Sequence, residues 1–367
     1  MQTSIAQTDT QSTGLTGWLR NNATIMIVYL VLVAFPFIVA LLNGQAITGM
    51  LANETGSALF LQGLLIEIFI LAIYAISYDL ILGVTGLLSF GHAMFFAVGA
   101  YGTGIMFKNL EWGIVPTVIG IVVLGILQAL LFGLVLARVK GITFALVTLG
   151  FASVFYIVIQ SNELSAFTGA DVGLQGIIVP DFLSTSTQRF RLYFITLTTA
   201  LGVYLVYRRF VDSPTGRVCI ANRENEERAL MLGYNTFYFK LTALIISSIT
   251  AALAGFFHAV HQPIVSPNVA SLGWTVAALL MILIGGVGTL TGAYIGAAVY
   301  RLLEYFLDKW FGTEANFLLG LVYILLVLFV PYGIVGTWRS QQYKLKQYWA
   351  DLTKLFTGKE PSEQLKP

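Results

Sequence analysis

The length of three apolar stretches limits what this chain can fold into more than any other feature. Residues 58–107, 112–159 and 274–306 each run for more than thirty residues and each carry only two charged residues. A bilayer core of roughly 30 Å is crossed by about 20 helical residues, because each residue of an α-helix rises about 1.5 Å. Each stretch must therefore break and cross more than once, which predicts an all-α, polytopic membrane protein.

Three short clusters mark where these stretches break. They are "GVTGLLSFGH" at residues 83–92, "ARVKG" at 137–141 and "GGVGTLTG" at 285–292. Glycine allows a helix to break, and the freed backbone groups can line a polar cavity inside the membrane. Four further apolar runs are each long enough for one crossing, namely residues 25–42, 192–207, 241–260 and 317–330. Together with the broken stretches they predict about ten transmembrane segments. If one of the broken pieces is a re-entrant hairpin, this count changes by two.

The distribution of lysine and arginine predicts the orientation, since cytoplasmic loops are enriched in these residues. If the N-terminus is cytoplasmic, 15 of the 20 fall inside, one lies within a span, and four fall outside, namely Lys108, Arg189, Arg191 and Lys309. The residue within a span is Arg301. Both termini are therefore predicted to be cytoplasmic.

The chain is predicted to have one membrane domain with a polar segment at each end. Residues 1–24 form a cytoplasmic N-terminal segment, residues 25–335 the transmembrane domain, and residues 336–367 a cytoplasmic tail. No lysine or arginine precedes Arg20, so the start lacks the charged region of a cleaved signal peptide, and the first apolar run is expected to be retained. A net charge of +2 gives no indication of nucleic-acid binding, and a single cysteine, Cys219, excludes an internal disulfide.

Charge is concentrated in one cytoplasmic loop of about residues 208–239, called the charged loop below. Its residues 217–228 hold three arginines and three glutamates, although only 10% of the chain is charged. The loop is predicted to contain a short helix that is capped by Ser213 with Pro214 at its first position, or by Asn222, and that stops at Gly233. Within it, Glu224–Arg228 and Arg223–Glu227 are spaced as i,i+4 pairs.

Two interpretations of this loop stay open from the residues alone. Most charged runs of this kind are solvated helices on a loop. Alternatively, the helix is a docking surface for a soluble partner, because a charged helix between two spans could transmit a push into the membrane. Ala229, Leu230 and Leu232 would add a small apolar side to such a surface.

Four motifs in order resemble one family of transport proteins. The string "ERALMLG" at 227–233 is similar to the Glu-Ala-Ala-x-x-x-Gly loop of ABC importer permeases, with Arg228 in place of the first alanine. The segment around it resembles the branched-chain amino-acid ABC permease family, which also includes urea and amide transporters. The segments "SYDLILGVTGLLSFGHAMFFAVGAYGTG" (77–104) and "ALLMILIGGVGTLTGAYIGA" (278–297), with "FALVTLGFASVFYIV" and "TGADVGLQGI", extend the likeness over about residues 58–307.

The resemblance implies a subunit of a multi-pass complex in the bacterial inner membrane. It implies cytoplasmic ABC ATPase subunits, a second homologous permease and an extracytoplasmic substrate-binding protein as partners, besides membrane lipid. The subunit itself would be non-catalytic and without a cofactor, and the sequence has no G-x-x-x-x-G-K-[ST] motif for ATP. The residues expected to couple it to the ATPase are Arg223, Glu224, Glu227, Arg228, Ala229, Gly233 and Asn235.

A second set of candidate residues lies inside the membrane region, where polar groups are costly and often functional. We expect a translocation pathway or hinge at the two glycine-rich breaks and at Glu67, namely Gly86, Ser89, Phe90, Gly91, His92, Glu67, Gly285, Gly286 and Gly288. His92 could equally be a neutral, hydrogen-bonded imidazole, and Glu67 a protonated or paired structural group. Gly292 and Gly296 are better suited to close helix packing, and Arg301 with Glu304 forms a self-neutralising i,i+3 pair. No metal site is indicated.

The leading prediction is a permease subunit of an ABC importer for amino acids, most of all branched-chain or apolar ones. A secondary transporter of small polar solutes would also use glycine-broken helices, but such proteins are usually built from internal repeats, of which the sequence gives only a trace. A permease of the same family for urea or amides is a further alternative. An ion channel would require a filter or a ring of pore-lining charges, and no such motif is present.

Overall fold

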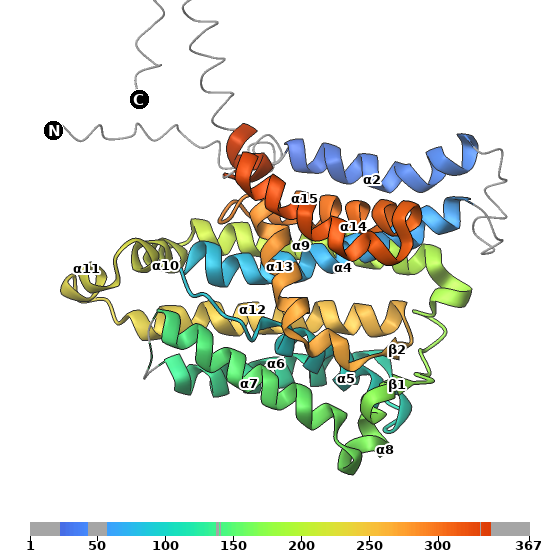
Figure 1. Cartoon of the computed structure of the whole chain (residues 1–367), viewed down its shortest axis with the longest axis horizontal. Helices are drawn as coiled ribbons and strands as arrows, with labels where there is room; N and C mark the ends of the chain where they lie inside the picture. The colour runs from blue at the N-terminus through green and yellow to red at the C-terminus, as the bar shows by residue number, and fades with distance from the viewer. Residues whose placement is uncertain (1–22, 43–56, 137–138, 140, 331, 339–367) are drawn as a thin grey trace, which may run out of the picture.

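The computed structural model describes residues 23–42, 57–136, 139, 141–330 and 332–338. Most of the described chain is helical, and the long helices run side by side in one general direction (Figure 1). In chain order the long helices are α2 (Ala23–Leu42), α4 (Ser57–Asp79), α5 (His92–Lys108), α6 (Ile114–Leu136), α7 (Ile142–Gln160), α9 (Thr185–Asp212), α12 (Thr236–His261), α13 (Leu272–Gly285), α14 (Thr291–Phe311) and α15 (Ala315–Phe329). Two short helices, α10 (Pro214–Glu224) and α11 (Glu226–Met231), lie between α9 and α12.

The three long apolar stretches break at the predicted clusters. The first divides into α4, which continues as a π-helix, η1 (Leu80–Val84), and α5, with no helix in residues 85–91. The second divides into α6 and α7, and the third into α13 and α14. The four single runs lie in α2, α9, α12 and α15, so each predicted segment is a helix.

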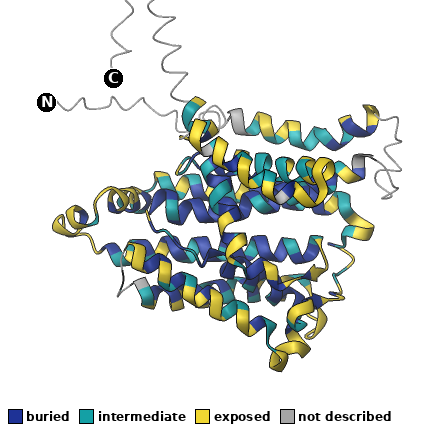
Figure 2. Cartoon of the chain, viewed as in Figure 1, coloured by how far each residue is buried: buried dark blue, intermediate teal, exposed yellow. Residues whose placement is uncertain are grey.

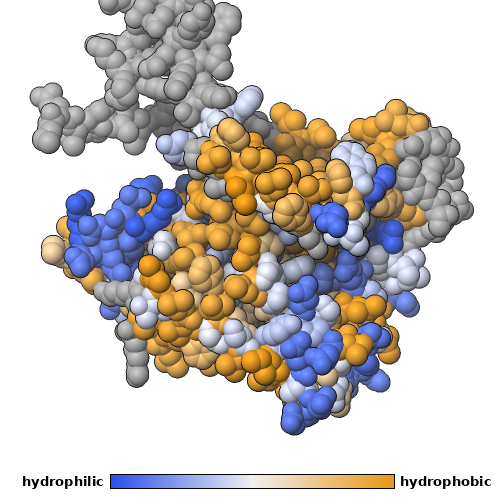
Figure 3. All heavy atoms as spheres, in the orientation of Figure 1, coloured by the Kyte–Doolittle hydropathy of each residue, from blue (hydrophilic) through white to orange (hydrophobic). Residues whose placement is uncertain are grey.

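Among the described residues, five helices are long and apolar enough to cross a membrane. They span Leu59–Val84, Ile114–Val135, Ile142–Gln160, Thr185–Asp212 and Thr236–His261, and shorter apolar helices cover Met26–Leu42, Leu272–Gly285 and Phe317–Leu326. Figure 3 shows apolar side chains over the middle of the helices and hydrophilic ones gathered at their two ends. This is the architecture of a multi-pass membrane protein.

The core of the bundle is formed by α4 and α12. In the most apolar stretch of α4 and of α12, 67% and 72% of the residues are buried. In the other three helices of membrane-spanning length, α6, α7 and α9, the buried share is 28% to 39%. α12 packs on α4, α5 and α6, and α4 packs also on α9 and α14 (Figure 2). The outer helices α6, α7 and α15 expose large apolar side chains such as Leu134, Val154 and Leu328.

Small residues let the central helices come close. A Cβ atom on Gly99 of α5 would collide with the backbone of Ala252 on α12, and one on Gly255 would collide with the carbonyl of Phe96. Gly292 and Gly296 pack α14 onto α13 in the same way, as predicted, because an added Cβ would meet the backbone of Gly285 and Met281. Close approach of this kind is a main source of helix association where water is absent.

The two ends of the bundle differ. The end that carries α10 and α11 is called the loop end, and the opposite one, which carries α8 (Ser165–Thr168), the far end. At the far end a two-residue strand, β1 (Leu174–Gln175), pairs antiparallel with β2 (Ile264–Val265). The all-α prediction is therefore correct for the described helices and misses this short ladder, which is too brief for a period-two pattern to be visible in the sequence.

Candidate functional site

The charged loop projects from the loop end as two short helices, α10 and α11 (Figure 1). The first one begins as predicted: Pro214 occupies the first helical position, and Ser213 Oγ accepts a hydrogen bond from the Gly216 N–H at 3.2 Å. Figure 3 shows mainly hydrophilic side chains on this projection. The loop is thus a defined, capped structure that reaches beyond the apolar band.

The prediction of a single helix in this loop was wrong. α10 ends at Glu224, Asn225 is extended at φ −163°, and its side chain caps α11 by accepting from the Arg228 N–H at 2.9 Å. Asn222, offered as an alternative cap, is instead buried within α10. Because the helix is interrupted at Asn225, Glu224–Arg228 and Arg223–Glu227 do not lie along one helix as i,i+4 pairs.

The residues predicted to couple to an ATPase mostly face solvent. Glu224, Glu227, Arg228 and Asn235 are exposed, and Ala229 is buried. Gly233 has a φ of +86°, a left-handed conformation typical of a helix stop, and its N–H donates to the Leu230 carbonyl at 2.9 Å. Next to the charges lies an exposed apolar group made of Leu230, Met231, Leu232 and Tyr234.

One ion pair that the sequence did not predict holds the charged loop to the bundle. Glu226 Oε1 lies 2.7 Å from Lys240 Nζ and accepts a hydrogen bond from Thr236 Oγ1 at 2.9 Å. Lys240 and Thr236 are buried at the start of α12. α11 is thus joined to α12 through an ion pair with a largely buried lysine.

Arg223 makes a second connection, between α10 and the first glycine-rich break. Its Nη1 donates a hydrogen bond to the carbonyl oxygen of Gly83 in η1. Gly86, which follows with a φ of +74°, packs against the same arginine: an added Cβ would lie 3.0 Å from Arg223 Cγ. The first break therefore contacts the charged loop directly.

The second glycine-rich break meets the first at the same place. A Cβ on Gly83 would collide with the backbone of Gly288, whose φ is +75°. Asp79, the last residue of α4, joins the two breaks because Oδ1 accepts from the Gly288 N–H at 2.6 Å and Oδ2 from the Leu290 N–H at 3.2 Å. The loop end thus has a junction of Arg223, Gly83, Asp79 and Gly288, called the junction below.

The remaining residues of the first break pack into the core. A Cβ on Gly91 would collide with the carbonyl of Thr148 on α7, and the Phe90 N–H donates to Thr148 Oγ1 at 3.2 Å. His92 is buried, with Nε2 2.8 Å from Ser77 Oγ. Ser89 Oγ accepts from the Gly91 N–H at 3.3 Å. This half of the break is closely packed and hydrogen-bonded.

Gly285 and Gly286 form the start of the second break. Gly285 lies against the carbonyl of Gly292, and Gly286 has a φ of +120°. These two glycines turn the chain from α13 into α14 and hold the ends of the two helices together.

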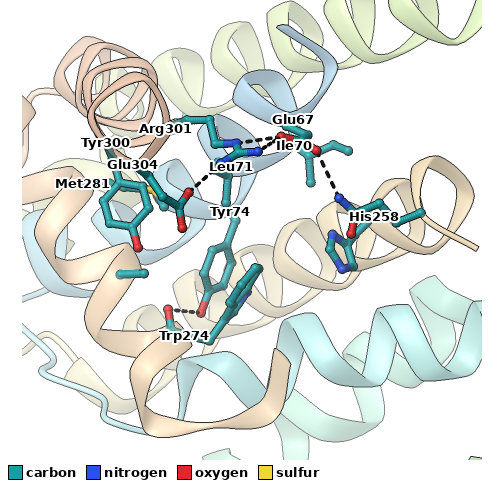
Figure 4. A pocket seen from close by; sticks show the side chains of 12 residues that line it. Glu67, Ile70, Leu71, Tyr74, His258, Trp274, Met281, Tyr300, Arg301 and Glu304 are labelled. Atoms are coloured by element: carbon teal, nitrogen blue, oxygen red, sulfur yellow. Dashed lines mark hydrogen bonds and ion pairs between the residues drawn. The ribbon is translucent and has the colours of Figure 1, made fainter. Parts of the chain in front are cut away.

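Glu67 lies apart from the junction, in the half of α4 nearer the far end. It lines a cavity of about 200 Å³ between α4, α12, α13 and α14 (Figure 4). Arg301 Nε donates a hydrogen bond to Glu67 Oε2 at 2.6 Å. Arg301 Nη2 forms an ion pair with the same oxygen at 2.5 Å. Arg301 Nη1 also donates to Glu304 Oε2 at 2.8 Å, so the predicted i,i+3 contact forms. The pair is not self-neutralising as predicted, because the same guanidinium also binds Glu67.

The structure thus separates the predicted intramembrane residues into three places. Gly86 and Gly288 lie at the junction with Arg223, Gly91 and His92 pack in the core, and Glu67 lines the cavity. Asp79, Gly83 and Glu226 are not among the site residues predicted from the sequence. The one local signal for Asp79 was a carboxylate at the edge of a glycine-rich break, where backbone N–H groups need acceptors.

Cys219, the single cysteine of the chain, is a buried thiol. The thiol is buried in α10, where burial raises its pKa to about 11, and it contacts the Phe239 carbonyl at 3.6 Å. Within the part of the chain that the structure describes, no three His, Cys, Asp or Glu side chains are grouped so as to hold a metal ion.

Comparison with known proteins gives one family. The family model described as "Branched-chain amino acid transport system / permease component" matches residues 60–330. No solved structure matches the chain.

Several curated proteins are similar over most of the chain. The high-affinity branched-chain amino acid transport system permease protein LivM of Salmonella typhimurium is 28% identical over 295 residues, which are 73% of this chain and 68% of that protein. The permease protein LivH of the same organism is 25% identical over 289 residues, or 72% of this chain and 91% of LivH. A probable LivM of Methanocaldococcus jannaschii is 28% identical over 197 residues, covering 52% and 57% of the two chains.

Proposed function

Since this chain belongs to the family of branched-chain amino acid transport permease components, we propose that it is the membrane-spanning permease subunit of an ABC importer for branched-chain amino acids. In this role it forms part of the translocation pathway and hydrolyses no ATP itself. Separate cytoplasmic ATPase subunits drive it, and an extracytoplasmic binding protein delivers the substrate. The pathway is completed by a second homologous permease, as the two similar relatives LivM and LivH suggest.

The junction is the observation that carries this proposal. Arg223 of α10 bonds to the first glycine-rich break, and Asp79 binds the second break to the first. A small movement at one site is amplified when the helices and interfaces next to it have two stable packing arrangements. A push on the charged loop would therefore reach the breaks that precede α5 and α14, as an ATP-driven pathway requires.

We place the charged loop and both termini in the cytoplasm, with the far end outside. The uneven distribution of lysine and arginine supports this orientation, and the first residue of α2 and the last of α15 lie toward the loop end (Figure 1). In this proposal all ten helices of the predicted apolar segments, five of them long enough to cross a membrane by themselves, are transmembrane segments. Residues 25–335 form the permease domain, and residues 1–24 and 336–367 are cytoplasmic. The membrane is the bacterial inner membrane.

The exposed surfaces fit the proposed partners. Glu224, Glu227 and Arg228 lie beside the exposed Leu230 and Met231 on the charged loop, a mixed surface suited to a groove of a soluble ATPase. The apolar surface of α6, α7 and α15 suits lipid and the second permease.

Reconstitution tests this function. The chain is co-expressed with its partner permease and ATPase, placed in liposomes, and supplied with the binding protein and radiolabelled leucine. We expect uptake that requires ATP on the side of the charged loop and the binding protein on the opposite side. Uptake driven by an ion gradient without ATP would identify a secondary transporter instead, and uptake of urea but not leucine would contradict the proposed substrate.

A further inference from the structure

The cavity around Glu67 has more negative than positive charge. One guanidinium, that of Arg301, is shared by two carboxylates, Glu67 and Glu304. Arg301, Glu67 and Glu304 together carry a formal charge of −1, and His261 Nε2 lies 3.6 Å from Glu67 Oε1. Charged groups inside a membrane are costly unless they are paired, and such a site attracts a cation.

Glu304 provides a carboxylate oxygen that can bind a cation in the cavity. Its side chain is 43% exposed, compared with 20% for Glu67. Glu304 Oε2 binds Arg301, while its Oε1 takes part in none of the hydrogen bonds and ion pairs found among the described residues. A carboxylate oxygen accepts hydrogen bonds readily from an ammonium group, which has three donors.

The rest of the cavity is suited to a small apolar group. Ile70, Tyr74, Trp274 and Met281 line it beside the charged residues (Figure 4). Its volume of about 200 Å³ lies below the range of about 300–1,000 Å³ that is common for drug-sized ligands. The space therefore fits a solute of the size of an amino acid.

We propose that this cavity is a binding site on the translocation route for an amino acid zwitterion, with the ammonium group on Glu304 and the apolar side chain against Tyr74, Trp274 and Met281. Arginine has five N–H donors, of which three are engaged, so two are left for the carboxylate of the substrate. This inference rests on the proposed function and adds the residues that recognise the substrate after its release from the binding protein.

The test measures binding to the permease–ATPase complex without the binding protein, by titration calorimetry. Three probes separate the two ends of the substrate: leucine, isoamylamine, which is leucine without its carboxylate, and isocaproate, which is leucine without its ammonium group. We expect leucine and isoamylamine to bind, and isocaproate to bind at least about tenfold more weakly.

Two variants and one control locate the site. Glu304→Gln keeps the size of the side chain and its bond to Arg301, and we expect it to lower the affinity for leucine and isoamylamine at least about tenfold. Trp274→Ala should weaken leucine binding through loss of the apolar wall. Lys309→Gln is the control, because Lys309 lies on the same helix, outside the cavity, over the ring of Tyr305; its affinities should be unchanged.

The inference is overturned if isocaproate binds as well as isoamylamine, if no probe binds, or if both variants bind like the native complex. Uptake by the native reconstituted system separates this failure from that of the proposed function. If the native system takes up leucine with ATP but the binding results contradict the inference, then only the proposed binding site in the cavity is wrong. If the native system takes up no leucine, the proposed function itself is wrong.

Discussion

Arg223 lies where the charged loop and a glycine-rich break meet, which gives one side chain an influence on two elements. Its guanidinium donates to a carbonyl of η1 and its aliphatic part packs on Gly86. A hydrogen bond from a charged donor contributes about 1.5–3 kcal/mol. The contact is therefore a testable link between the charged loop and the first break.

Arg223→Gln should uncouple transport without preventing assembly. The shorter, neutral side chain no longer reaches the Gly83 carbonyl, so we expect leucine uptake per ATP hydrolysed to fall by about 5- to 150-fold, the range of a coupling free energy of about 1–3 kcal/mol. Arg217→Gln, on the exposed side of the same helix, is the control. Equal effects of the two substitutions on uptake and hydrolysis would show that the contact has no special role.

Gly91→Ala should destabilise the protein, because the new Cβ meets the carbonyl of Thr148. Overpacking of this kind costs about 1–3 kcal/mol. Gly150→Ala on α7 is matched to it: no atom lies within 4 Å of the added Cβ, so its effect should be neutral or slightly stabilising. Thermal unfolding of both purified complexes checks the prediction, and a Gly91→Ala midpoint at or above that of Gly150→Ala would refute it.

At the scale of elements, the sequence is informative where the signal is local. The length of each apolar run predicts a long helix, and the short clusters within the longest runs predict where a helix ends. Both signals are local, because each segment must by itself match the thickness of the bilayer and pair its own backbone N–H and C=O groups. The division of the charged loop was not predictable in this way: Asn222 and Asn225 are both good caps by residue type, but in the folded chain Asn222 is buried within α10 and Asn225 caps α11. The bond from Arg223 to Gly83 spans 140 residues, and no local pattern encodes it.

The exposed face of α11 should carry the contact with the ATPase. Glu227 is exposed, so Glu227→Lys should leave the subunit folded and inserted. Truncating one partner of a buried interface charge pair costs roughly 2–5 kcal/mol, and reversal should be at least as harmful. We expect loss of ATPase co-purification and of uptake, whereas Glu163→Lys at the far end should retain both. A Glu227→Lys complex that stays intact and fully coupled would make α11 merely a solvated helix.

At the scale of the whole molecule, orientation can be measured directly with exposed positions at the two ends. Val172 is 68% exposed at the far end and Met231 is 85% exposed on the charged loop. The native Cys219 is buried and its thiol pKa is raised to about 11, so it should stay unlabelled near neutral pH and need not be replaced. Val172→Cys should react with an impermeant maleimide from outside, and Met231→Cys only from the cytoplasmic side. Reaction of both from one side would contradict the proposed topology.

The π-helix at Leu80–Val84 has a consequence for how this protein tolerates changes in length. A π-turn holds one residue more than an α-turn, so a single-residue deletion there would restore an ordinary helix. Such a deletion would also remove the wide turn in which the Gly83 carbonyl accepts from Arg223, while leaving the apolar character of α4 intact. Substitutions among its aliphatic residues should therefore be accepted far more easily than any insertion or deletion.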